Sequence, residues 1–212
     1  MMRYSFNQNT EGIVFAQRYD INASYKDLVA MCDAVRYRKV SDALDVIDKV
    51  IAMEMPVPYK RYSKHMGARH ELGGRKGAYP VKAAKELRLA ILNAVGNAKN
   101  RGLDGEGLVI VHSSANKTRI ERRYPSKGSI SWGRGMYGRG AINHSDIEYA
   151  KVEIGIANGD EKGVTKNMKY FIKKNEKKNG KKSRADAGQK AKEKARKPQP
   201  AQAGAEKQKT SA

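Results

Sequence analysis

Three segments of the chain carry apolar residues at the spacing of an amphipathic helix. The first follows Ser24, a candidate N-cap, and its apolar stripe is Leu28, Met31, Cys32 and Val35. The second follows Ser41 as its N-cap, with the stripe Ala43, Leu44, Ile47, Val50 and Ile51. The third has Pro80 in its first turn and ends at Gly102, with the stripe Ala84, Leu87, Ile91, Ala94 and Ala98. The pattern predicts three helices, and the alanines of the third indicate a close packing partner.

Two other segments show the pattern of β-strands. Leu108–Val111 is a short apolar run that follows a turn-forming stretch. Further along, Val152, Ile154 and Ile156 alternate with Lys151, Glu153 and Gly155, which predicts a strand with one buried face and one solvated face. A third strand is expected within Arg3–Asn7 or Gly12–Arg18. We therefore predict an α+β fold in which three helices pack on a small three-stranded antiparallel sheet.

The composition changes near residue 158 and divides the chain in two. Residues 1–157 have a net charge of +10, and residues 158–212 have +11 in a much shorter stretch. After Ile172 no Leu, Ile, Val, Met or aromatic residue occurs, so this part cannot bury enough apolar surface to offset the entropy of ordering. We predict one domain over 1–157 and a basic, mostly disordered tail over 158–212, in which Met168–Ile172 could begin a short helix.

The charge of the chain limits its function classes. Lys and Arg number 43 against 22 Asp and Glu, which gives a net charge of +21. Two kinds of partner bind such a basic protein favourably: nucleic acid, through the release of counterions, and an anionic membrane surface. No apolar run is long enough to span a membrane, the first residues do not resemble a secretory signal, and the single cysteine, Cys32, excludes an internal disulfide. We expect a nucleic-acid-binding protein of a reducing compartment.

The most informative segment lies between the two predicted strands. Its part from Lys117 to Arg139 combines seven cations with three aromatic residues and several glycines, and Glu121 is the only acidic residue there. Because a small domain cannot bury so much unpaired charge, we predict a long β-hairpin that projects from the body over about 113–148. Arginines can grip phosphates and rings can stack on unpaired bases. A soluble loop without a partner is the alternative interpretation. The candidate RNA-binding residues are Lys117, Arg119, Arg122, Arg123, Tyr124, Lys127, Trp132, Arg134, Tyr137 and Arg139.

A second basic stretch runs from Tyr59 to Arg88 and includes a Gly-rich loop. Its two histidines, His65 and His70, have no third ligand nearby, so contacts to phosphate or base are expected in place of a metal site. Lys82 lies early in the third helix, where it opposes the helix dipole unless an anion binds there. The candidate RNA-binding residues of this stretch are Lys60, Arg61, Lys64, His65, Arg69, Arg75, Lys76 and Lys82.

The sequence offers little that an enzyme would need. Gly133–Gly138 matches the spacing of a dinucleotide-binding loop, but no apolar strand precedes it and no periodic helix follows. No arrangement of Ser, His and Asp, of Cys and His, or of paired carboxylates stands out. We predict that the protein is not an enzyme and uses no cofactor or metal.

Several motifs resemble one known family. They are Met55–Arg61 (MPVPYKR), Gly77–Lys85 (GAYPVKAAK), Asn93–Ala98 (NAVGNA), Gly102–Asp104, and Val109–His112 leading on to Asn116–Lys117. Together with Ile21–Cys32 they are similar to ribosomal protein L twenty-two of the large subunit, in its archaeal and eukaryotic form (numbered seventeen in eukaryotes). The resemblance extends from about Tyr4 to Ile156.

The resemblance implies a specific architecture and function. Members have a small α+β body that contacts several ribosomal RNA domains, and a long hairpin whose tip forms part of the wall of the nascent-peptide exit tunnel. By position, the body contacts would fall on the cations of 60–82 named above and the hairpin contacts on those of 117–139. The hairpin apex here is longer than usual because of a Gly-rich insertion around 128–138, and the chain from Asn158 onward has no counterpart in the family.

The sequence therefore predicts a structural constituent of the large ribosomal subunit. Its expected partners are ribosomal RNA, neighbouring ribosomal proteins and, near the hairpin tip, the nascent peptide, without membrane insertion, and its expected location is the cytoplasm. A free-standing RNA chaperone or assembly factor is the alternative, because it could use the same basic hairpin. A protein held at a membrane surface by the Lys-rich tail is a third possibility.

Overall fold

The chain has an α+β fold with antiparallel sheets, as predicted, in a computed structural model that describes residues 4–103, 107–121, 147–159 and 164–177. Residues 166–177 are helical. The other elements are β1 (Val14–Ile21), α1 (Tyr25–Val35), α2 (Val40–Ile51), β2 (Val57–Pro58), β3 (Ala68–Arg69), the 3-10 turn η1 (His70–Leu72), β4 (Arg75–Ala78), α3 (Val81–Asn100), β5 (Leu108–Glu121) and β6 (Ile147–Asn158).

The central sheet has the strand order β1-β6-β5, and both pairings are antiparallel. Strand β1 pairs Val14 with Ile156, so the N-terminal strand lies at the later of its two expected positions. Strands β5 and β6 pair from Leu108 opposite Asn158 to Glu121 opposite Ile147. They extend well beyond the predicted apolar runs because backbone pairing continues where the side chains become polar and exposed.

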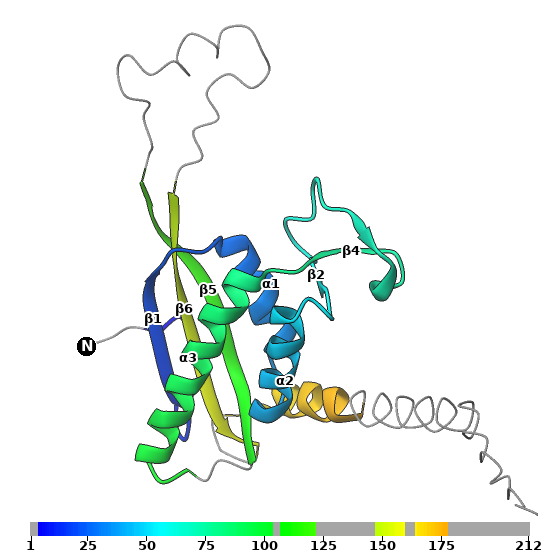
Figure 1. The fold of residues 1–212 in the computed structure, drawn as a ribbon. Coiled ribbons are helices and arrows are strands. Elements are labelled where there is room, and N and C mark those ends of the chain that lie inside the picture. Colours follow the sequence, from blue (N-terminus) through cyan, green and yellow to red (C-terminus); the bar gives the residue numbers. More distant parts are fainter. Residues whose placement is uncertain (1–3, 104–106, 122–146, 160–163, 178–212) are drawn as a thin grey trace, which may run out of the picture. The chain divides into compact units, whose positions relative to one another are not determined.

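Helices α1, α2 and α3 lie on one face of this sheet (Figure 1) and form the main core with it. The predicted stripes of α1 and α3 are buried throughout. In α2, Ala43, Ile47 and Val50 are buried, whereas Leu44 and Ile51 are only partly buried. Burial raises the pKa of the Cys32 thiol to about 11, in accord with its position in the core.

Two predicted helix starts are wrong by one or two residues. Helix α2 begins at Val40 with Lys39 as its N-cap, whereas Ser41 was expected there. The earlier start buries Val40, and the backbone N–H of Ala43 donates to the Lys39 carbonyl at 2.9 Å. Pro80 is the N-cap of α3 and not part of its first turn. At α2, the burial of Val40 and the β-bridge between Lys39 and Val109 favour the earlier start over the local capping preference of Ser41.

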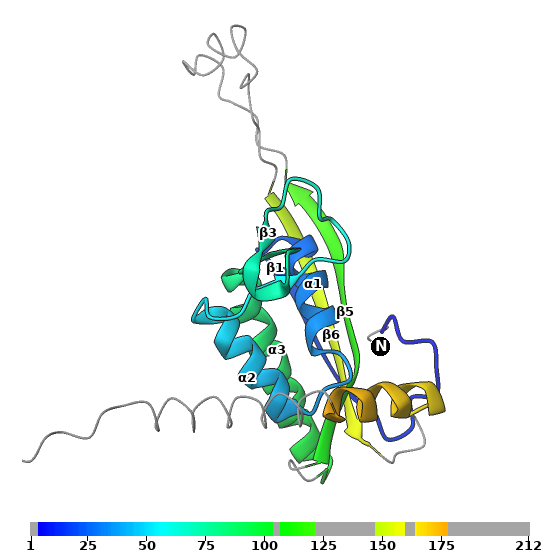
Figure 2. The same ribbon diagram turned by 90° about the vertical axis from the view of Figure 1, so that its right-hand side faces the viewer.

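The opposite face of the sheet is covered as well, which contradicts the predicted solvated face of β6. Figure 2 shows the N-terminal segment and the helical residues near 166–173 on the side away from α2 and α3. Val164, Met168 and Ile172 pack there with Ile13, Val109, Val111 and Ala157 in a second apolar cluster. Glu153 and Gly155 are therefore buried. A Cβ on Gly155 would lie 2.9 Å from the Phe15 ring, so glycine is required for this close packing.

Glu153 is a carboxylate with no solvent exposure, and it ties the N-terminal segment to the sheet. Its Oε2 accepts hydrogen bonds from the backbone N–H and Oγ of Ser5 at 2.7 and 2.6 Å. Its Oε1 accepts one from Gln17 at 3.0 Å and lies 3.0 Å from Nζ of Lys151. Burial opposes ionisation of Glu153, but Ser5 and Lys151 outweigh this effect and hold its pKa below the ordinary value.

Three further features differ from the sequence prediction or lie beyond it. A second small sheet, with the order β2-β4-β3, occupies the segment that was expected to be a Gly-rich loop. The compact unit continues to Lys173, past the predicted boundary at residue 157, because Val164, Met168 and Ile172 supply apolar contacts. The predicted hairpin tip, within 122–146, and most of the predicted tail, within 178–212, lie outside the described residues.

We expect Ile172→Ala to lower the free energy of unfolding by about 2 kcal/mol, because it removes a buried side chain from the second apolar cluster. Asn167→Ala is the matched control, since Asn167 is exposed on the same helix. Urea denaturation followed by circular dichroism measures both. Equal stability of the two variants would show that this helix does not contribute to the fold.

We expect the protein to lose stability as the pH falls. The pKa of His112 is lowered, mainly by burial. The contribution of His112 to the free energy of unfolding is therefore complete above pH of about 6.5, its ordinary pKa, and is lost as the pH falls further. The lowered pKa of Glu153 adds a second loss below its ordinary value of about 4.3. Glu153→Gln should cost about 2 kcal/mol at neutral pH and remove the second loss.

The control for Glu153→Gln is Glu148→Gln on the same strand. Glu148 is partly exposed and pairs with Lys117 at 2.7 Å, so this substitution should change stability little. Urea midpoints measured across the acid range would compare the three proteins. If Glu153→Gln lost stability below pH of about 4.3 as steeply as the unmodified protein, Glu153 would not be the cause of the second loss.

Candidate nucleic-acid interface

The second sheet holds the first basic stretch in a defined shape. Strand β4 lies in its centre and pairs Ala78 with Val57 of β2 and Lys76 with Ala68 of β3. Gly73 and Gly74, with φ of 64° and 79°, form the turn into β4 in a backbone region that favours glycine. A Cβ on Gly77 would lie 2.7 Å from the Val57 carbonyl oxygen, so glycine is needed there for β2 to approach β4.

The predicted cations of this sheet and its loop are mostly exposed. Within the ranges that the structure describes, none of the following forms an ion pair with a carboxylate: Lys60, Arg61, Lys64, Arg75 and Lys76. His65 is exposed among them and has a positive φ of 63°, as does Tyr62 with 56°. Such backbone conformations cost free energy for residues other than glycine and are found at binding sites. The segment presents positive charge that no carboxylate of the described chain offsets by direct pairing.

Arg69 differs from its neighbours because the fold already uses its side chain. It is partly buried, its Nε donates to the Gly77 carbonyl oxygen at 3.1 Å, and its guanidinium lies 5.3 Å from the centre of the Tyr79 ring. The Tyr79 hydroxyl donates in turn to Glu71 at 3.4 Å. Arg69 thus stabilises strand β4 through this hydrogen bond, and only its remaining N–H groups can bind a ligand.

The first residues of the predicted hairpin also have partners within the protein. Nζ of Lys117 lies 2.7 Å from Oε1 of Glu148 on the paired strand. Arg119 lies 3.6 Å from Asp20 and 3.3 Å from Glu121, and its guanidinium stacks on Tyr149 at 4.4 Å. Such solvent-accessible ion pairs contribute little to the stability of the fold. They organise the base of the hairpin, where β5 and β6 leave the body.

An aromatic pair that sequence analysis missed brings the two basic stretches together. The ring of Tyr25, at the start of α1, meets that of Tyr62 edge to face at 5.5 Å. Lys117 of β5 lies 5.5 Å from the Tyr25 ring, and Lys26 lies 5.7 Å from the Tyr62 ring. A hydrogen bond with Tyr62 is the main cause of the raised pKa of Tyr25. A tyrosine among the cations of 59–88 was the signal that could have identified Tyr62.

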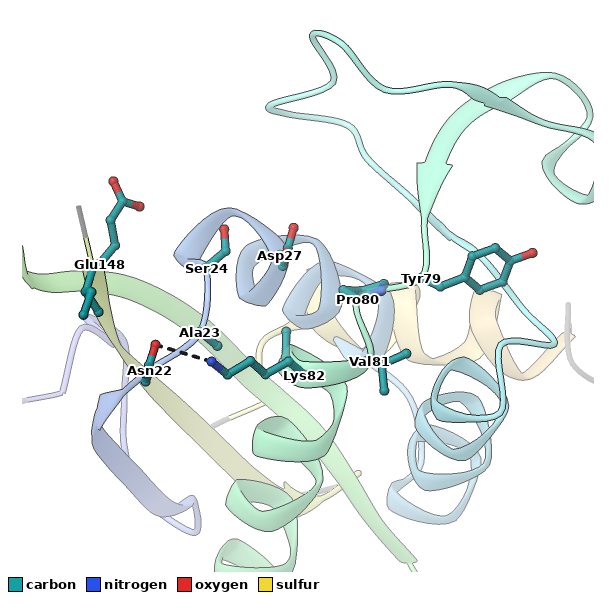
Figure 3. A pocket seen from close by; sticks show the side chains of 11 residues that line it. Asn22, Ala23, Ser24, Asp27, Tyr79, Pro80, Val81, Lys82 and Glu148 are labelled. Atoms are coloured by element: carbon teal, nitrogen blue, oxygen red, sulfur yellow. Dashed lines mark hydrogen bonds between the residues drawn. The ribbon is translucent and has the colours of Figure 1, made fainter. Parts of the chain in front are cut away.

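A polar cavity of about 600 Å³ lies where α1 and α3 begin. Its lining includes Asn22, Ser24, Asp27, Lys82 and Glu148. Figure 3 shows Lys82 reaching from the start of α3 to Asn22, whose Oδ1 accepts its hydrogen bond at 3.4 Å. The two carboxylates are already engaged, because Asp27 accepts from the Tyr59 hydroxyl at 2.7 Å and Glu148 pairs with Lys117. Lys82 therefore lies beside the hairpin base and not with the other cations of the second sheet.

The remaining predicted site residues lie outside the described residues. They are Arg122, Arg123, Tyr124, Lys127, Trp132, Arg134, Tyr137 and Arg139. Across the described ranges, no group of three His, Cys, Asp or Glu side chains is placed to hold a metal ion. In the same part of the chain, no helix has both the length and the apolar character needed to cross a membrane.

Comparison with known proteins gives one consistent family. The model of the family described as Ribosomal protein L22p/L17e matches residues 16–147. The large ribosomal subunit protein uL22 of Archaeoglobus fulgidus is 38% identical over 112 residues, which are 51% of this chain and 71% of that protein. The protein of the same name from Methanosphaera stadtmanae is 33% identical over 156 residues, which are 73% of this chain and 96% of that protein.

The matched residues run from Ala16 within β1 to Ile147, the first residue of β6, and so include α1, the second sheet, α3 and β5. The family consists of structural ribosomal proteins and not of enzymes, in agreement with the expectation from the sequence. By this match over more than half of its length, the chain belongs to the ribosomal protein L22p/L17e family.

Proposed function

We propose that the protein is a structural constituent of the large ribosomal subunit that binds ribosomal RNA through two surfaces. The first is the second sheet with its loop, from Tyr59 to Ala78. The second is the hairpin built on β5 and β6, which carries the basic and aromatic residues of 117–139. Membership of the family, whose relatives are named as large-subunit proteins, supports this assignment.

The observation that carries the proposal is the contrast between the two sets of cations. On the second sheet, Lys60, Arg61, Lys64, Arg75 and Lys76 gather without direct carboxylate partners in the described structure, although the whole chain holds 22 acidic residues. Mutual repulsion among such groups disfavours the isolated protein, and phosphates remove this repulsion with release of counterions. The charge pattern is therefore complementary to RNA.

The hairpin is proposed to carry the second function of the family, a wall of the nascent-peptide exit tunnel near its tip. The register of β5 and β6 leads the chain from Glu121 into the basic stretch and back at Ile147, so the segment between them is joined to the body by one paired stem. Exposure increases along β5 toward Glu121, as expected for a stem that leaves the core. Neighbouring ribosomal proteins and the nascent peptide are the further proposed partners.

Retention on ribosomes tests the proposal against a transient assembly factor. We expect purified large subunits to contain this chain in stoichiometric amount and to retain it after a moderate salt wash, because many phosphate contacts must break together. Quantitative mass spectrometry of washed subunits measures the ratio. A chain found only on precursor particles, or lost in the wash with known factors, would favour the RNA chaperone or assembly factor.

We expect Lys60→Ala/Arg61→Ala to weaken binding to a large-subunit ribosomal RNA transcript and to make the salt dependence less steep. Each lost phosphate contact should reduce the slope of log K against log salt by about 0.7 to 0.9. Filter binding over a range of salt concentrations provides this slope. Circular dichroism would check that the variant stays folded.

The matched control for this pair is Lys99→Ala/Arg101→Ala, which removes the same charge from exposed positions at the far end of α3. The control should leave the slope close to that of the unmodified protein. Equal losses in both variants would mean that net charge alone governs binding and that the second sheet is not a specific surface.

A further inference from the structure

The C-terminal helix exposes aromatic rings beyond the residues that the family model matches. Tyr170 is 60% exposed and Phe171 is 45% exposed, although both belong to the compact unit that ends at Lys173. Moving a large aromatic side chain out of water lowers the free energy. An exposed pair of such side chains on an ordered helix therefore indicates a surface that a partner covers. The family match ends at residue 147, and it therefore assigns no role to this surface.

The helix is anchored in one orientation by its apolar positions. Val164, Met168 and Ile172 follow each other at intervals of four and are 4%, 7% and 7% exposed. They pack on the side of the sheet opposite α1 and α3, against Ile13 and Val109 among others. Because this stripe faces the sheet, exposed residues of the helix such as Lys166 and Tyr170 lie on its outer face.

A third ring, that of the partly buried Tyr37, lies against Phe171. Tyr37 stacks on Phe171 with ring centres 5.6 Å apart and planes 15° apart, and Phe171 meets Tyr170 at 5.5 Å and 73°. Tyr37 has a positive φ of 61°, and its backbone N–H donates to the Ile110 carbonyl oxygen at 2.8 Å. The pairing with β5 thus holds Tyr37 in a backbone conformation that is costly for a tyrosine and places its ring beside Phe171.

The charge around these rings favours RNA as the occupant. From Val164 to Lys173 the chain carries Lys166, Lys169 and Lys173 and no acidic residue. Rings that stack on bases, with cations spaced to reach the phosphates, are the combination used by proteins that bind single-stranded RNA. A protein partner would need a strongly acidic apolar patch to match the same surface, and this chain is proposed to reside among RNA.

We propose that Tyr170, Phe171 and Tyr37 form a stacking platform for an unpaired nucleotide of single-stranded RNA, with Lys166, Lys169 and Lys173 binding the adjacent phosphates. The inference rests on the proposed function in that the ligand is RNA. It adds a third RNA-binding surface, on the face of the central sheet opposite the helices, to the second sheet and the hairpin.

A single tryptophan reporter tests the platform in the full-length chain. Trp132, the only tryptophan, is replaced by Trp132→Phe, and Tyr170→Trp then places the only indole on the proposed platform. Unlabelled single-stranded oligoadenylate is the probe, because an adenine that stacks on the indole quenches its fluorescence. Filter retention of the radiolabelled oligonucleotide measures total binding in parallel. The matched control is Leu92→Trp in the same background, at a position that is 40% exposed on α3.

We expect saturable quenching of the indole at position 170 and none at position 92. Adding Phe171→Ala to the reporter should shift the quenching curve to higher RNA concentration by about tenfold, as expected from the loss of one stacking contact. Retention of the oligonucleotide on the filter without quenching at position 170 would overturn the platform and leave the proposed function intact. Failure of the unmodified protein, with Trp132 in place, to retain either the oligonucleotide or a large-subunit ribosomal RNA transcript would overturn both, whereas retention of the transcript alone would overturn only the platform.

Discussion

Burial of both faces of strand β6 is the constraint on which the rest of the structure depends. This strand hydrogen-bonds to β1 on one side and β5 on the other, so its backbone is satisfied only when both ends of the domain are in place. One face carries Val152, Ile154 and Ile156 into the helical core. The other carries Glu153 beneath the N-terminal segment, where Ser5, Gln17 and Lys151 surround its carboxylate. A buried charge with so many partners specifies one arrangement of the covering segment.

The candidate interface follows from the way this body distributes its charges. On β5 the cations face carboxylates of the paired strand or of β1, and they form a stem that is electrostatically organised before any ligand arrives. On the second sheet and its loop, the predicted cations Lys60, Arg61, Lys64, Arg75 and Lys76 form no ion pair with a carboxylate of the described structure. The two regions meet at Tyr25 and Tyr62. The base of the hairpin and the loop of the second sheet are thus joined through this aromatic pair, with Lys117 over the Tyr25 ring and Lys26 over the Tyr62 ring.

Periodicity predicted the parts of the fold that local pattern determines. The stripe of α3, for example Leu87 and Ile91, is buried as expected, because a helix with one apolar side has only one way to cover a sheet. The burial of Glu153 could not be predicted, since an alternating strand has the same pattern whether its polar face meets water or a segment from the other end of the chain. Strands β2 and β3 have two residues each, too short for any period to be visible. The exposed cations were evident from composition, whereas the engagement of Arg69 and Arg119 depends on contacts across the fold.

The position of β6 in the chain has a consequence for how the protein is made. The strand that completes the sheet is the last of its strands to leave the ribosome, and β1, its first partner, is synthesised more than a hundred residues earlier. Until β6 emerges, β1 and β5 have no shared neighbour, and their unpaired edges and apolar side chains are open to wrong association. Such long-range pairing also slows folding. A nascent chain of this topology is safest when it is shielded until its end is released.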